Sequence, residues 1–142
     1  MTQWLRRVFN ALIESVDLRY GTFPTSADAV AAAAITIAAA AVAWTFGAWT
    51  QIVAAVGVTV DTQIWGCTLE NFVGAVAQGE VEIARGGVGA EVMLVKVPIV
   101  GAVYTFPKPV FVPVGTRISA RYRTSTGVAD TVDVKLLTTT GF

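Results

Sequence analysis

The chain has 142 residues, which suits a single domain, and its ten basic and ten acidic side chains give a net charge of zero. Without a positive field to attract phosphates, nucleic acid is not expected as a partner. Hydrophobic residues make up 54% and charged residues only 14%, against a usual charged share of about 25%. Neighbouring subunits can cover so apolar a surface, which predicts that the chain works in an assembly.

The residues that most enzymes use for catalysis are missing. The sequence has no histidine, and Cys67 is its only cysteine. These counts exclude an internal disulfide, a zinc site of the usual Cys/His type and a nucleophile paired with histidine. We therefore expect a non-enzymatic protein with no catalytic residue, no cofactor and no metal site. Cys67 is expected in the core as a small hydrophobic side chain.

Residues 1–22 have the pattern of an amphipathic helix or arm. Their apolar side chains recur at a spacing that keeps them on one side of a helix: Trp4, Leu5, Val8, Phe9, Leu12, Ile13 and Val16. Gly21 and Pro24 then end the helix. We expect this apolar side to dock on a partner. Packing on the chain's own core and binding to a membrane surface are the alternatives.

Residues 23–43 are an alanine-rich connecting segment. Alanine favours a helix, whereas Ile35, Thr36 and Ile37 favour a strand, which is the conformation we expect. No charged residue occurs from 29 to 60, a stretch long enough to span a bilayer. Its alanines, glycines and threonines favour lipid only weakly, and no basic cluster lies close to either end, so a membrane span is not expected.

From residue 44 to residue 142 the pattern predicts a β-domain. Apolar and polar residues alternate in several short stretches, of which 117–123 and 131–136 are the clearest and are expected to be neighbouring strands. Gly86 to Gly89 predicts a hairpin turn, and the prolines of residues 106–110 predict an edge strand. About eight short strands favour an all-β chain folded as a sandwich, a jelly roll or a barrel.

Three arginines share one face of a predicted strand: Arg117, Arg121 and Arg123. Like charges so close together require acidic partners. We expect Asp130 and Asp133 of the following strand to supply them within the chain. Acids of an adjacent subunit, or a ligand or glycan, are the alternatives, so the three arginines are candidate partner-binding residues.

Two further groups are interpreted as structural. The first comprises glutamates that alternate along strands without the close spacing of a calcium loop, and it is expected to form a solvated strand face: Glu80, Glu82 and Glu91. The second comprises tryptophans that we expect in the core and not on a sugar-binding platform: Trp44, Trp49 and Trp65.

Three segments follow one another in a distinctive order. They are residues 46–53 (FGAWTQIV), 80–91 (EVEIARGGVGAE) and 113–121 (PVGTRISAR). Their patterns, GAW-T, E-I-x-x-G-x-x-G-x-E and P-x-G-T/S-R-I-x-x-R, together resemble small virion proteins of tailed bacteriophages, over about residues 44–137. The resemblance implies a jelly-roll-like β-sandwich of the capsid decoration, or cement, type. It carries over no catalytic or metal residue.

The resemblance also sets the expected location and partners. It implies a protein of the virion, on the surface of the phage head, that assembles as a dimer or trimer and contacts the major capsid protein or other virion subunits. The N-terminal arm lies outside the matched region. A tail, baseplate or fibre component and a carbohydrate-binding host-attachment module are the alternatives.

Overall fold

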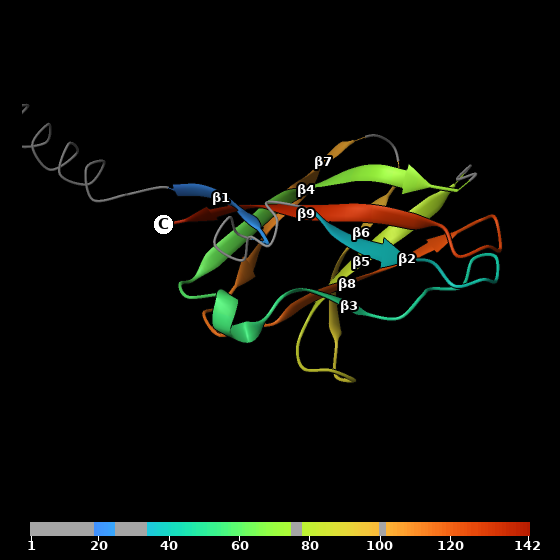
Figure 1. The fold of residues 1–142 in the computed structure, drawn as a ribbon. Helices are drawn as coiled ribbons and strands as arrows, with labels where there is room; N and C mark the ends of the chain where they lie inside the picture. The colour runs from blue at the N-terminus through green and yellow to red at the C-terminus, as the bar shows by residue number, and fades with distance from the viewer. Residues whose placement is uncertain (1–18, 25–33, 75–77, 100–101) are drawn as a thin grey trace, which may run out of the picture.

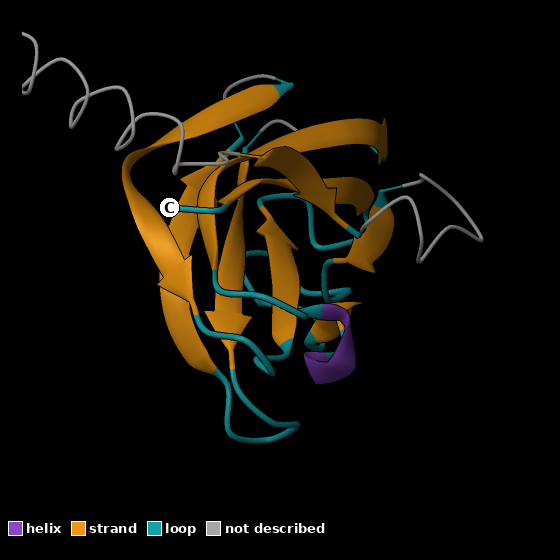
Figure 2. Ribbon diagram, turned by 90° about the vertical axis from the view of Figure 1, so that its left-hand side faces the viewer, coloured by secondary structure: helices purple, strands orange, loops and turns teal. Residues whose placement is uncertain are grey.

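The computed structural model describes residues 19–24, 34–74, 78–99 and 102–142. In these residues nine strands form two antiparallel sheets, which pack face to face as a β-sandwich (Figures 1 and 2). The prediction of an all-β chain is therefore confirmed. Residues 1–18 of the predicted helix or arm lie outside the described residues, and with them the proposed docking side chains Trp4, Leu5, Val8, Phe9, Leu12, Ile13 and Val16.

The first sheet contains five strands, four of them in the order β1-β9-β4-β7. Their bounds are β1 (Arg19–Phe23), β9 (Thr131–Thr140), β4 (Thr62–Val73), β7 (Val103–Val112) and, off this path, β2 (Ile35–Ala38). Because β4 occupies one edge of β9, β1 and β2 share the other: β1 pairs with residues 136–140 and β2 with residues 131–134. The two short strands therefore follow one another along a single neighbour.

The second sheet contains four strands in the order β3-β8-β5-β6. Their bounds are β3 (Thr50–Val53), β8 (Ile118–Thr124), β5 (Gly79–Arg85) and β6 (Val92–Pro98). The short 3-10 helix η1 (Ala55–Gly57) lies in the connection that leaves this sheet for β4. From β2 onward, every connection crosses between the sheets except β5–β6. That hairpin turns through Gly86 and Gly89, whose φ angles are 120° and 80°, as the glycine cluster predicted.

The core lies between the sheets and comes from the inward face of each strand. In β9, Val132, Val134 and Leu136 are fully buried while the residues between them are half-buried, the alternation that a strand with one covered face requires. Tyr122 of β8 is the largest fully buried side chain. Cys67 is fully buried as predicted, and burial raises the pKa of its thiol to about 12.

The proline-containing segment is an edge strand, as predicted. β7 is the last strand of the first sheet and, among the described strands, pairs only with β4. Val110 pairs with Ile64 and Thr105 with Gly66, so the intervening residues bulge out of the pairing. This bulge contains Pro107 and Pro109, which have no N–H to donate to a neighbouring strand.

Two expectations about neighbouring segments are wrong. Arg19–Phe23 forms β1, although residues 1–22 were expected to form an amphipathic helix or arm and residues 23–43 a connecting segment. β8 and β9, expected to be neighbouring strands, lie in different sheets, because the intervening connection crosses the sandwich. The strand expected around Ile35, Thr36 and Ile37 is confirmed, because Ile35–Ala38 forms β2 and not the helix that was the alternative. No helix among the described residues is long and apolar enough to cross a bilayer.

Candidate functional site

The three arginines predicted as a group lie on or just before β8, on the outer face of the second sheet. Arg121 and Arg123 alternate with Ala120, Tyr122 and Thr124, whose side chains are buried. Alternation within the strand therefore directs both guanidinium groups away from the core.

Arg121 and Arg123 each pair with a glutamate of β5. Register places Arg121 opposite Glu82 and Arg123 opposite Glu80. Arg121 Nη2 lies 2.6 Å from Glu82 Oε2, and Arg123 Nη2 lies 2.8 Å from Glu80 Oε1. The glutamates therefore do not form the solvated face that the sequence predicted: the Glu82 side chain is only 5% exposed.

Arg117 is held by a different part of the chain. Its Nη1 lies 3.1 Å from Glu91 Oε1, and the same nitrogen donates to Gly86 O at 3.1 Å. Its Nε donates to Gln51 Oε1 at 3.1 Å. Arg117 thereby ties the β5–β6 connection to β3, the edge strand on the opposite side of the sheet.

The expectation that Asp130 and Asp133 pair with the arginines is wrong. Asp133 lies in β9, which belongs to the first sheet, and Asp130 directly precedes β9. Neither pairs with the arginines on the outer face of the second sheet. Asp130 instead accepts from the hydroxyls of Thr124 and Thr126. Asp133 accepts from Asn71 and Thr36 on the first sheet.

Glu82 is the centre of the charged group. Arg121 lies on one side of it and Lys96 on the other, with Lys96 Nζ 3.0 Å from Glu82 Oε1. Burial raises the pKa of Glu82, but hydrogen bonds from Lys96 and Arg121, together with their positive charges, outweigh that effect and hold the pKa below its ordinary value of 4.5. Glu82 therefore stays ionised at neutral pH.

Aromatic rings from the segment before β3 cover two of the arginines. The guanidinium carbon of Arg121 lies over the rings of Phe46 and Trp49, at 4.4 and 4.3 Å from their centroids. That of Arg123 lies over Phe46 and Trp44, at 4.6 and 5.7 Å. Rings and cations thus alternate in one chain of contacts, which we call the arginine–aromatic cluster: Trp44, Arg123, Phe46, Arg121 and Trp49. Cation–π contacts of this kind are attractive in their own right.

Trp44 forms the open end of the arginine–aromatic cluster. Its side chain is 47% exposed, and its φ of 57° is rare for a bulky residue. The backbone is held in that conformation by its N–H, which donates to Thr124 O at 2.7 Å, and by its carbonyl, which accepts from Arg123 Nη1 at 3.4 Å. The expectation that the tryptophans are core residues is wrong, since Trp49 and Trp65 are only half-buried.

Sequence reasoning missed Phe46. A signal was present, because Trp44 and Phe46 are two residues apart and so point to the same side of an extended segment. Arg117, Arg121 and Arg123 all have partners within the chain. The contacts of the arginine–aromatic cluster hold residues 44–49 against β8. That a partner also binds these arginines stays a prediction.

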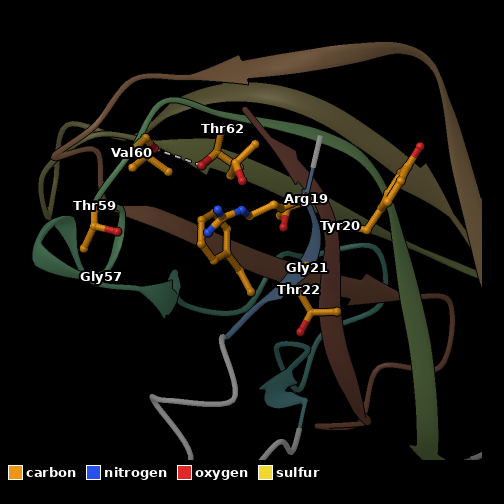
Figure 3. A pocket seen from close by; sticks show the side chains of 11 residues that line it. Arg19, Tyr20, Gly21, Thr22, Gly57, Thr59, Val60 and Thr62 are labelled. Atoms are coloured by element: carbon orange, nitrogen blue, oxygen red, sulfur yellow. Dashed lines mark hydrogen bonds between the residues drawn. The ribbon is translucent and has the colours of Figure 1, made fainter. Parts of the chain in front are cut away.

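A cavity of about 300 Å³ lies at one end of the sandwich (Figure 3). Its walls come from β1, the end of η1 and the connection after it, the start of β4 and the end of β9. The lining residues are Arg19, Tyr20, Gly21, Thr22, Phe23, Gly57, Thr59, Val60, Thr62, Thr138 and Thr140. In Figure 3 the Arg19 side chain extends toward the middle of the residues that line the cavity. No sequence pattern pointed to this place, because the lining residues come from three separate stretches of the chain, 19–23, 57–62 and 138–140.

Within the part of the chain that the structure describes, no group of three or more histidine, cysteine, aspartate or glutamate side chains is placed to hold a metal ion. The sequence matches no model of a known protein family and no curated protein.

Proposed function

We propose that the sandwich is a jelly roll and that the chain is a structural protein of a virus particle. A jelly roll has eight strands in two sheets. With β1 and β2 taken as one interrupted strand, the first strand pairs with the last, β3 with β8, β4 with β7, and β5 with β6. This nested pairing supports the assignment, because it is what results when one long antiparallel hairpin is rolled into a sandwich.

The proposed role is to decorate and stabilise a phage capsid. Jelly rolls occur in capsid proteins, but also in lectins and other proteins, so the fold alone does not decide the function. The resemblance of residues 44–137 to small phage virion proteins supports a place on the phage head. A low charge content of 14% supports a chain whose surface is largely covered by other subunits.

The observation that carries the assembly proposal is the outer face of the first sheet. Register places Tyr20, Thr139, Gln63 and Phe111 side by side across four strands. Tyr20 is 77% exposed and Phe111 46% exposed, and Phe142 meets Phe111 edge-on with ring centroids 6.1 Å apart. Exposed aromatic side chains on a sheet with few charges are typical of a surface that binds another protein.

Self-association tests this surface. Sedimentation of the purified chain is expected to give a dimer or trimer, and Phe111→Lys is expected to shift it toward the monomer. Val88→Lys is the matched control, because Val88 is 86% exposed in the β5–β6 turn, away from this face. A wild-type monomer, or an oligomer that Phe111→Lys leaves intact, would contradict the proposal.

Particle binding tests the role of the N-terminal arm. Because β1 begins at Arg19, a deletion of residues 2–17 removes the proposed docking side chains and leaves the sandwich complete. Virions that carry this variant are expected to contain much less of it than of the full chain, as measured on gels of purified particles. Equal occupancy would refute the docking arm, and absence of the full chain from purified virions would refute the location itself.

A further inference from the structure

We propose that the cavity at the end of the sandwich binds an acidic monosaccharide unit, a function beyond capsid stabilisation. At about 300 Å³ the cavity is at the lower end of the range for small-molecule sites, about 300–1,000 Å³, which suits a single sugar ring. It lies between β1 and the connection that crosses to β4. Neither of these segments belongs to the arginine–aromatic cluster.

The lining has the amphipathic chemistry of a sugar. Five threonines contribute to it: Thr22, Thr59, Thr62, Thr138 and Thr140. Each brings a hydroxyl that both donates and accepts, and a methyl group that packs against C–H bonds. Phe23 and Val60 add apolar surface. A sugar ring presents the same mixture, with hydroxyls around its rim and C–H groups on its faces.

Two of these hydroxyls are at the buried side of the cavity. Thr62 is 2% exposed and Thr138 is 3% exposed. The Thr62 hydroxyl donates to Val60 O at 2.9 Å, so its oxygen is left to accept from a ligand. Gly21 faces Thr138, and a Cβ added there would lie 3.2 Å from Thr138 Oγ1. Glycine at this point of β1 therefore keeps the space in front of that hydroxyl open.

The charge of the lining selects an acidic ligand. Among the described residues that line the cavity, Arg19 is the one charged residue and there is no aspartate or glutamate. Arg19 also takes part in an interaction within the chain. A guanidinium has five N–H donors, however, so a ligand carboxylate can share it. A neutral sugar would make the hydroxyl contacts and forgo this charged one.

The test is a titration of the full chain with glucuronate and with glucose, which differ only by a carboxylate in place of a CH₂OH group. Threonine methyl signals in NMR spectra report the cavity, and the indole signal of Trp44 reports the opposite sheet. We expect glucuronate to shift the methyl signals of Thr59, Thr62 and Thr138, with a Kd at least tenfold lower than that of glucose.

Variants separate the charge from the hydroxyls. Arg19→Gln is expected to weaken glucuronate binding at least tenfold and to leave glucose binding unchanged, whereas Thr59→Val is expected to weaken both. Both side chains are exposed, so the fold is retained. Lys108→Gln is the control, because Lys108 is an exposed cation of β7 outside the cavity.

Four results would overturn the proposal. They are no binding of glucuronate, equal affinity for the two sugars, shifts at Trp44 in place of the threonines, and binding that appears only after deletion of residues 2–17. The last would assign the cavity to the arm of the chain itself.

Discussion

Arg121 donates to Glu82 through two nitrogens, Nε at 2.7 Å and Nη2 at 2.6 Å from the same carboxylate oxygen, while the rings of Phe46 and Trp49 lie over the guanidinium. The ion pair joins β8 to β5, and the rings join the chain before β3 to β8. One arginine thus connects three segments on the outer face of the second sheet. A surface ion pair alone contributes little to stability, but this one is partly buried and covered.

Replacing Glu82 with glutamine tests the ion-pair group. The variant keeps the shape of the side chain but leaves Arg121 and Lys96 without their shared charge. We expect the free energy of unfolding to fall by about 1–3 kcal/mol, the usual cost when a partly buried charged group loses its partner. Chemical denaturation measures it, with Glu70→Gln on the exposed end of β4 as the control. Equal midpoints for both variants would contradict the expectation.

Acid should weaken the fold through the same carboxylates. Burial raises the pKa of Glu82 and of Glu91, yet hydrogen bonds lower both below 4.5, from Lys96 and Arg121 for Glu82 and from backbone N–H groups and Arg117 for Glu91. A lowered folded-state pKa gives stability that is present above pH 4.5 and is lost as the pH falls through the folded-state value. Denaturation between pH 6 and pH 2 should therefore be flatter for Glu82→Gln than for the wild type.

Phe46 is predicted to stabilise the fold through both arginines. Phe46→Ala removes the ring that lies under Arg121 and Arg123, and cation–π contacts contribute about 0.5–2 kcal/mol each. We expect a loss of about 1–3 kcal/mol, of which Phe46→Leu recovers only the packing part. A double-mutant cycle with Arg121→Met isolates the contact. A coupling energy near zero would show that the ring and the cation act independently.

Much of the fold could be read from the sequence because its signals are local. Alternation identifies the inward face of β9, the prolines of residues 106–110 identify an edge, and Gly86 and Gly89 identify a turn. Each of these depends on the conformation of a few consecutive residues. Local patterns of this kind do not specify which strands become neighbours.

The arginine partners were missed for that reason. β8 and β9 adjoin in the sequence, which favoured Asp130 and Asp133, but the connection between them crosses the sandwich. The true partners are Glu82 for Arg121, Glu80 for Arg123 and Glu91 for Arg117, all of them earlier in the chain than the arginines. Trp44 was likewise expected in the core, because hydrophobicity does not reveal that an indole covers a distant guanidinium.

Cys67 should react only when the chain unfolds. It is fully buried, and burial raises the pKa of its thiol to about 12, so the reactive thiolate is scarce at neutral pH. We expect no labelling by iodoacetamide at pH 8 in the native protein and complete labelling in denaturant. Rapid labelling of the native protein at a rate independent of denaturant would contradict the buried position.

Gly47 and Gly87 make a matched pair for testing how closely the chain before β3 approaches β2. A Cβ at Gly47 would lie 2.0 Å from the carbonyl oxygen of Ala38, a backbone atom that cannot turn aside, whereas a Cβ at Gly87 would meet nothing within 4 Å. Gly47→Ala is therefore expected to lower the free energy of unfolding by at least about 1–3 kcal/mol, as overpacking does. Gly87→Ala is expected to leave it unchanged or to raise it by up to about 1 kcal/mol, because alanine restricts the unfolded chain.

Tryptophan fluorescence gives a second readout of the same contact. Gly47 N–H donates to Tyr122 O at 2.9 Å, so the clash should disturb the contact of residues 44–49 with β8. The fluorescence of Trp44 and Trp49 should therefore change in the Gly47 variant alone. Similar stability and similar fluorescence in the two variants would mean that the segment does not lie against β2 and β8 as closely as described.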